Sequence, residues 1–227
     1  MHRHVIMEPK KQMRVFAEYI EEADLTYRKN TLLQFGSSWK LIGNAVLANP
    51  GSSRPISKLG SGTIQSVGEF FNYYRHGASA KTANWYEFSS DSTMRQVEKI
   101  FSGWYLGEDR ELNGVIQLFN TFNVVNQNLR KAVGLIESGS EHMFSPACHQ
   151  YFNNCRTYFG FSSAVLGNKE LNRVAKEIFD GSSGDVKKPY KEQFSDNKFY
   201  HPGYVNRSYK RDFFRSYKEE ILSAMVG

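Results

Sequence analysis

Three places in the chain put a hydrogen-bonding side chain where an apolar or aromatic run ends. The apolar run in residues 114–124 breaks at Asn120, the run in residues 41–51 reaches Asn49, and His201 stands in an aromatic, basic stretch. An amide side chain both donates and accepts hydrogen bonds, which suits it to reading one edge of a nucleobase. Loops that follow the carboxyl ends of parallel strands meet at one edge of a sheet. We therefore expect these three side chains to belong to one ligand site.

The residues after Asn49 support this expectation. Pro50, Gly51 and Ser52 follow directly, so a hydroxyl lies close to the amide, and the glycine lets a ligand approach the backbone. The alternative is an ordinary turn at the end of a strand, where Asn, Pro and Gly are favoured for backbone reasons. Local turn chemistry is also the alternative for Asn120, because further asparagines follow it closely.

His201 suggests a role different from that of the two amides. A histidine held in a dry pocket can donate a hydrogen bond to an anion that forms during a reaction. The alternative is a structural or surface histidine. Metal chemistry is not indicated, because the only Cys and His cluster matches no common zinc spacing; it consists of His142, Cys148, His149 and Cys155. Neither a phosphate-binding loop nor the Gly-x-Ser-x-Gly elbow of serine hydrolases is present, and we expect no metal and no cofactor.

A basic segment near the carboxyl end adds a second candidate surface. Residues 187–218 contain nine Lys and Arg and three acidic residues, so this segment alone accounts for the formal net charge of +6. Aromatic residues are interleaved with the cations, as in surfaces that contact a phosphate backbone and stack on bases. The alternative is a solvated basic helix face. The candidate nucleic-acid contacts are Arg207, Lys210, Arg211 and Arg215.

Hydrophobic periodicity and turn signals predict the elements that position these residues. Strands are expected over residues 39–48, 113–120, 156–162 and 190–194, a polar loop over 51–62, and helices over 8–23, 64–75, 128–138, 168–180 and 208–225, with one more from a cap region at 90–93 to about residue 104. Strands and helices alternate, which predicts a three-layer α/β/α fold around a central, mainly parallel four-stranded sheet. We expect one domain over residues 1–227, with residues 1–38 as an N-terminal helical extension.

Composition excludes several classes of protein. The chain has 227 residues, of which 40% are hydrophobic, and this is enough for one substantial core. Its first residues lack the apolar segment of a secretory signal, and no apolar run reaches the length of a membrane span. With two cysteines, the chain is expected to be cytoplasmic, with reduced thiols and no membrane contact.

Taken in order, these segments resemble the uracil-DNA glycosylase superfamily. Residues 43–51 look like the water-activating first motif of its mismatch-specific and single-strand-selective branches, with Asn49 at the place of the water-positioning asparagine. The strand before Asn120 is similar to the family strand whose terminal asparagine reads the uracil edge. Residues 158–162 are a loose counterpart of the family's apolar Trp-Gly strand, and residues 201–203 look like its His-Pro-Ser segment, whose histidine stabilises the leaving base.

The chain looks closer still to a family of bacterial and phage proteins of unknown function that shares this fold. The shared features are an Asn-Pro-Ser-type first motif, an Asp-x-Thr helix start at residues 91–93, an Asn-Leu-Phe-like strand and a terminal His-Pro-Leu-Tyr, here residues 201–204. The resemblance spans roughly residues 40–206. The chain departs from the superfamily by one extra residue before Asn120, by Gly203 in place of serine, and by the absence of an aspartate-bearing first motif.

The resemblance implies an enzyme that hydrolyses the N-glycosidic bond of a damaged or modified base in DNA. Asn49 would then hold the attacking water, and His201 would stabilise the departing base. Substrate contacts would come from Asn120, Pro50, Gly51, Ser52 and an aromatic ring, assigned to Phe71 ahead of Tyr73 or Tyr74. Two alternatives stay open: a module of the same fold that binds nucleic acid or a nucleotide without catalysis, and an enzyme that acts on free nucleosides or nucleotides.

Overall fold

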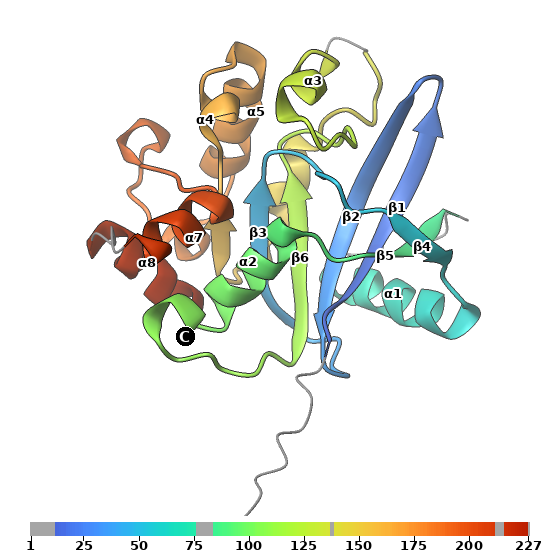
Figure 1. The fold of residues 1–227 in the computed structure, drawn as a ribbon, viewed down its shortest axis with the longest axis horizontal. Helices are drawn as coiled ribbons and strands as arrows, with labels where there is room; N and C mark the ends of the chain where they lie inside the picture. The colour runs from blue at the N-terminus through green and yellow to red at the C-terminus, as the bar shows by residue number, and fades with distance from the viewer. Residues whose placement is uncertain (1–11, 76–83, 137–138, 212–215, 227) are drawn as a thin grey trace, which may run out of the picture.

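The computed structural model describes residues 12–75, 84–136, 139–211 and 216–226. A seven-stranded sheet runs through its centre in the order β4-β5-β1-β2-β6-β3-β7 (Figure 1). The strands are β1 (Arg14–Glu22), β2 (Leu25–Phe35), β3 (Leu41–Leu47), β4 (Pro55–Lys58), β5 (Trp85–Phe88), β6 (Gly114–Asn120) and β7 (Thr157–Phe159). β3 pairs in parallel with β6 and β7, whereas the other pairings are antiparallel. The α/β class is confirmed, but the expected four-stranded, mainly parallel sheet is wrong.

Helices cover both faces of this sheet. The α-helices are α1 (Ser61–Tyr74), α2 (Ser92–Phe101), α3 (Leu129–Val133), α4 (Ser163–Leu166), α5 (Lys169–Asp180), α6 (Gly184–Lys187), α7 (Pro202–Lys210) and α8 (Ser216–Val226), and the 3-10 helices are η1 (Trp104–Leu106), η3 (Pro146–Tyr151) and η4 (Phe194–Asp196). One core joins α1 to Phe16 and Val115, and a larger core joins α2 to Val15 and Ile116. Because side chains alternate along a strand, these two cores lie on opposite faces of the sheet. Within the described ranges, no helix has the length and apolar character needed to span a bilayer.

The antiparallel half of the sheet comes mainly from the N-terminal part of the chain. The helix expected over residues 8–23 is wrong in its described part, because Arg14–Glu22 form β1; residues 1–11 lie outside the described residues. Val15 and Phe16 are consecutive, and both are buried because each face of the strand is covered. A short run of consecutive apolar residues does not distinguish such a strand from a helix. The helical extension expected over residues 1–38 is thus replaced by the β1–β2 hairpin, and β2 pairs with β6 (Figure 1).

The strands expected over residues 39–48, 113–120 and 156–162 are present as β3, β6 and a shorter β7, and they place the candidate residues. Buried amides link the strands, since Gln117 Nε2 donates to Asn44 Oδ1 at 3.0 Å and Asn44 Nδ2 donates to Thr157 Oγ1 at 3.0 Å. Figure 1 shows α2 crossing β3 and β6. A β-carbon on Gly43 would lie 2.1 Å from the Phe101 ring, so α2 packs against β3 at a distance that only glycine allows.

The structure confirms some of the predicted helices and strands in the rest of the chain and contradicts others. The helix after the cap region is confirmed, since Asp91 Oδ1 accepts a hydrogen bond from the backbone N–H of Met94 at 2.9 Å. The strand expected over residues 190–194 is wrong, because the aromatic side chains there pack into the core without joining the sheet. The single helix expected over residues 208–225 is also wrong: α7 begins earlier, at Pro202, and α8 is separate, with residues 212–215 outside the described part. The expected loop over 51–62 contains β4 and the start of α1.

Candidate functional site

Two pockets open at the carboxyl edge of the parallel strands. β3 and β6 end side by side, with Leu47 paired to Asn120. The pocket on the α2 and α7 side, named the His201 pocket, has a volume of about 260 Å³. The pocket on the α1 and η3 side, named the Arg75 pocket, has a volume of about 400 Å³. Leu118 of β6 lines both of them.

The His201 pocket collects five of the seven residues predicted for the site. It is lined by Arg28, Leu47, Ala48, Asn49, Pro50, Gly51, Ser52, Asp91, Ser92, Thr93, Met94, Leu118, Gln127, Leu129 and His201. The loop after β3, the start of α2 and the start of α7 therefore meet here. The two predicted catalytic residues, Asn49 and His201, share this pocket.

The side-chain nitrogen of Asn49 bonds to the backbone and stabilises one wall of the pocket. Its Nδ2 donates to the backbone carbonyl oxygens of Asn126 at 2.9 Å and Val124 at 3.4 Å. These bonds tie the loop after β3 to the segment after β6. They also fix the orientation of the side chain and leave Oδ1 as the atom that can accept a hydrogen bond from water or a ligand.

His201 is held in a defined tautomer at the start of α7. Its Nδ1 accepts a hydrogen bond from the backbone N–H of Gly203 at 3.1 Å, so the neutral ring carries its proton on Nε2. Burial, and to a smaller degree the nearby Arg207, lower the pKa of His201 below its usual value, and Asp91 opposes them. At neutral pH the imidazole is therefore uncharged and its Nε2–H is a donor.

Asp91 and Arg28 complete the polar wall of this pocket. Asp91 caps α2 through Oδ1, and a β-carbon on Gly51 would lie 3.2 Å from Asp91 Oδ2. The fully buried Arg28 donates from Nη1 to the Ser53 carbonyl at 3.3 Å and from Nη2 to the Pro50 carbonyl. Burial lowers the pKa of Arg28 to about 10, with Asp91 opposing this shift, so the guanidinium stays charged at neutral pH. The sequence marked Asp91 as a helix cap, but its place in the pocket depends on tertiary packing.

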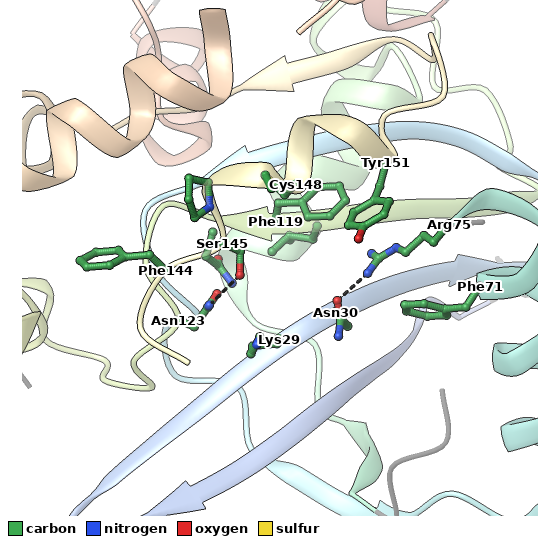
Figure 2. Close-up of a pocket in the computed structure, with 14 residues that line it drawn as sticks. Lys29, Asn30, Phe71, Arg75, Phe119, Asn123, Phe144, Ser145, Cys148 and Tyr151 are labelled. Carbon is green, nitrogen blue, oxygen red and sulfur yellow. Dashed lines mark hydrogen bonds between the residues drawn. The ribbon is translucent and has the colours of Figure 1, made fainter. Parts of the chain in front are cut away.

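Asn120 and Phe71 lie elsewhere than predicted. Both line the Arg75 pocket, whereas His201 lines the other pocket. This pocket is lined by Lys29, Asn30, Phe71, Arg75, Leu118, Phe119, Asn120, Asn123, Phe144, Ser145, Pro146, Ala147, Cys148 and Tyr151. Figure 2 shows the Arg75 guanidinium reaching toward Asn30, with Tyr151 and Phe119 close to it. The structure thus does not bring Asn120 into one pocket with Asn49 and His201.

The predicted basic residues are only partly assembled. Arg207 and Arg211 line a pocket of about 390 Å³, named the basic tyrosine pocket, whose full lining is Lys198, Tyr200, Tyr204, Arg207, Ser208, Arg211 and Lys218. Tyr200 and Tyr204 stack with ring centroids 5.6 Å apart. Lys210 is exposed and does not line this pocket, and Arg215 lies outside the described residues.

A further pocket of about 360 Å³, named the bridging pocket, shares lining residues with both the His201 pocket and the basic tyrosine pocket. Its lining includes His201, which also lines the His201 pocket, and Tyr200, Tyr204 and Arg207, which also line the basic tyrosine pocket. The pockets therefore follow one another along the surface of α7.

The cysteines offer no obvious site. Both Cys148 and Cys155 are free thiols, and burial raises the pKa of Cys148 to about 12. Over the residues that the structure describes, no three His, Cys, Asp or Glu side chains are grouped so that they could hold a metal ion.

Comparisons of the chain with protein-family models, with curated proteins and with solved structures gave no match. The resemblance to uracil-DNA glycosylases therefore stays a prediction, and function has to be argued from the pockets themselves.

Proposed function

We propose that this chain binds nucleic acid and hydrolyses the N-glycosidic bond of a damaged or modified base held in the His201 pocket. The observation that supports this most is the shared lining of the three pockets along α7. A strand gripped by the basic tyrosine pocket would pass the bridging pocket and present its next nucleotide to His201.

The lining of the basic tyrosine pocket suits binding of the phosphate backbone of the strand. Four cations line it, namely Lys198, Arg207, Arg211 and Lys218, and no acidic residue appears among its described lining residues. Lys218 Nζ lies 5.1 Å from the Tyr204 ring centroid, and Tyr204 remains partly exposed. Cations next to an exposed aromatic ring favour a phosphate backbone with a stacked base.

The His201 pocket has the chemistry for hydrolysis. In the reaction, the bond from the sugar C1′ to the base nitrogen breaks and its electron pair leaves with the base, while a water oxygen bonds to C1′. Asn49 Oδ1 would orient the water, and Asp91 would take its proton as a general base. His201 Nε2–H would donate to the departing base and stabilise its negative charge.

A second candidate is a binding module that performs no chemistry. It is favoured by the Asn49 amide, whose nitrogen is already bonded to backbone carbonyls, as in a purely structural asparagine. The same lining residues would then bind a nucleotide without cleaving it.

The test is a glycosylase assay on labelled oligonucleotides that carry uracil, hypoxanthine, xanthine or alkylated bases, followed by alkaline cleavage of abasic sites. The diagnostic variant is His201→Asn, because asparagine preserves the helix cap but removes the Nε2–H donor. His149→Asn, which changes a histidine outside the three pockets, is the matched control.

We expect strand cleavage with the wild type and the control, and its loss with His201→Asn. Binding without product would favour the module, and cleavage of free nucleosides alone would favour a small-molecule enzyme. Equal product from wild type and His201→Asn would contradict the proposed role of His201.

A further inference from the structure

Arg75 is a buried cation, and among the described residues no carboxylate bonds to it directly. It is 3% exposed. Its Nε donates to Gln117 Oε1 at 2.8 Å and its Nη1 donates to Asn30 Oδ1, and both acceptors are neutral amides. Among the described residues, Nη2 has no hydrogen-bond partner. Burial lowers the pKa of Arg75 to about 9, so the side chain is still protonated at neutral pH.

Glu18 is the acidic residue that raises the pKa of Arg75, and it bonds to Asn30 and not to Arg75 itself. Glu18 accepts a hydrogen bond from Asn30 Nδ2 at 2.8 Å, and Asn30 in turn faces Arg75. Glu18 does not line the pocket, and no Asp or Glu appears among the described residues that do. Lys29 adds a second cation to the lining. Burying a charge without a partner is costly, so the arrangement favours an anion that enters the pocket and bonds to Nη2.

The walls around Arg75 are aromatic. The guanidinium carbon lies 4.2 Å from the Phe71 ring centroid, 5.1 Å from that of Phe119 and 5.2 Å from that of Tyr151. These three rings line the pocket together with Phe144, so its walls suit a flat apolar body, and the volume of about 400 Å³ is that of a small-molecule site. The anion is therefore expected to be attached to a planar ring.

Asn120 adds a third requirement. Its Oδ1 is buried and has no hydrogen-bond partner in the described part of the chain, although it lines the same pocket. A buried acceptor without a donor costs free energy, and a ligand N–H or O–H would satisfy it.

We propose that the Arg75 pocket is a second ligand site, which binds a small aromatic anion that also carries a hydrogen-bond donor. The anionic group, a phosphate or a carboxylate, bonds to Arg75 Nη2, the ring lies against the aromatic walls, and the donor bonds to Asn120 Oδ1. This site is separate from the hydrolytic chemistry proposed for the His201 pocket and does not depend on it.

The experiment is isothermal titration calorimetry of the full chain with five probes. Uridine 5′-monophosphate and 4-hydroxybenzoate offer a ring, an anion and a donor, with phosphate or carboxylate as the anion. Uridine lacks the anion, benzoate lacks the donor, and inorganic phosphate lacks the ring. We expect at least one of the first two to bind, and the tighter of them identifies the anionic group.

Three variants test the assignment of roles. Arg75→Gln should weaken the best probe by about 10- to 100-fold, since it removes a charge-assisted bond. Arg173→Gln, on the exposed face of α5, is the control and should leave binding unchanged. Asn120→Leu should weaken 4-hydroxybenzoate but not benzoate if the carboxylate series binds; if the nucleotide binds, it should weaken uridine 5′-monophosphate. Asn120→Leu also tests the pocket independently of Arg75, so the proposal can still be refuted if Arg75→Gln folds poorly.

Undetectable binding of both full probes at millimolar concentration would overturn the proposal. Equal affinity of wild type and Arg75→Gln for the best probe would overturn it too. Because the probes are free small molecules and the variants lie outside the His201 pocket, a failure here leaves the oligonucleotide assay unaffected.

Discussion

The two pockets at the carboxyl edge of the sheet each contain a buried arginine, and the two arginines are used differently. Arg28 directs both terminal nitrogens at backbone carbonyls, those of Pro50 and Ser53, and so holds the loop after β3 in place. Arg75 bonds to two side-chain amides and leaves Nη2 without a partner among the described residues. One guanidinium is part of the framework of its pocket, whereas the other is available to a ligand.

The charges around the two arginines follow the same division. Asp91 lines the His201 pocket together with Arg28 and raises the pKa of this arginine against the effect of burial. Glu18 likewise raises the pKa of Arg75, but Asn30 lies between the two side chains and bonds to both of them. A pocket that already holds both charges suits proton transfer, and a pocket with a surplus positive charge suits anion binding.

The largest effect should come from removing the carboxylate of the His201 pocket. Asp91→Asn keeps an acceptor for the α2 cap but cannot take a proton, so we expect a loss of glycosidic cleavage of about 10²- to 10⁴-fold. Asn120→Leu, in the other pocket, should keep the rate within about threefold, because on the two-pocket assignment its side chain contacts no reacting atom. Single-turnover rates on the preferred oligonucleotide provide the measurement.

Asp185→Asn, at an exposed position in α6, is the control for the loss of one negative charge. Comparable losses with Asp91→Asn and Asn120→Leu would mean that both pockets serve one reaction, and the two-pocket comparison would fail.

The next largest effect should separate the two arginines by stability. Arg28→Gln leaves the Pro50 and Ser53 carbonyls without their shared donor, and we expect it to lower the free energy of unfolding by about 2–4 kcal/mol. Arg75→Gln also loses hydrogen bonds, but it removes a buried charge that no carboxylate of the described residues contacts, so its cost should stay at about 1 kcal/mol. Urea unfolding of the ligand-free proteins measures both. Equal costs would show that Arg75 is as much a framework residue as Arg28.

Local signals in the sequence predicted the parts of the site that depend on neighbours in the chain. The Asp91 side chain accepts a hydrogen bond from the backbone N–H of Met94, three residues later in the chain. The apolar run before Asn49 forms the mostly buried strand β3. These elements were predictable because their causes lie within a few residues. The expectation that the loop from Asn49 to Ser52 lies near His201 has a different basis, namely that loops after parallel strands meet at one edge of a sheet, and the two segments do line one pocket.

The rest of the site depends on contacts between distant segments. Arg28 and Arg75 look like ordinary surface residues in the sequence, and only the packing of β2 and α1 buries them. The sequence predicts Asn120 beside Asn49 because their strands end together, but Asn120 lines the Arg75 pocket and not the pocket of Asn49. The sequence of β1 predicts a helix because burial on both faces of the strand hides the alternation that marks a strand.

A smaller effect should distinguish the basic tyrosine pocket from both ligand pockets. Replacing Arg207 and Arg211 together by glutamine should weaken binding of single-stranded DNA and reduce the salt dependence of log K by about 0.7 per cation removed. Binding of small probes to the Arg75 pocket should not change, since these arginines do not line it. Lys169→Gln with Lys176→Gln, a pair on α5, is the matched control. An unchanged salt slope would exclude the basic tyrosine pocket from the DNA interface.

The smallest effect concerns the pH dependence of stability that His201 introduces. Its pKa is lowered in the folded chain by burial and by Arg207, against Asp91, so the unfolded chain binds this proton more readily. The stability of the wild type should therefore be level above the ordinary histidine pKa of 6.5 and fall as the pH drops below it. His201→Asn should lack this part of the decline, and His149→Asn should keep it. Urea midpoints between about pH 5 and 7.5 measure the difference. Parallel curves for wild type and His201→Asn would mean that the imidazole is as well solvated as in the unfolded chain, and the His201 pocket would lose the dry environment that its chemistry requires.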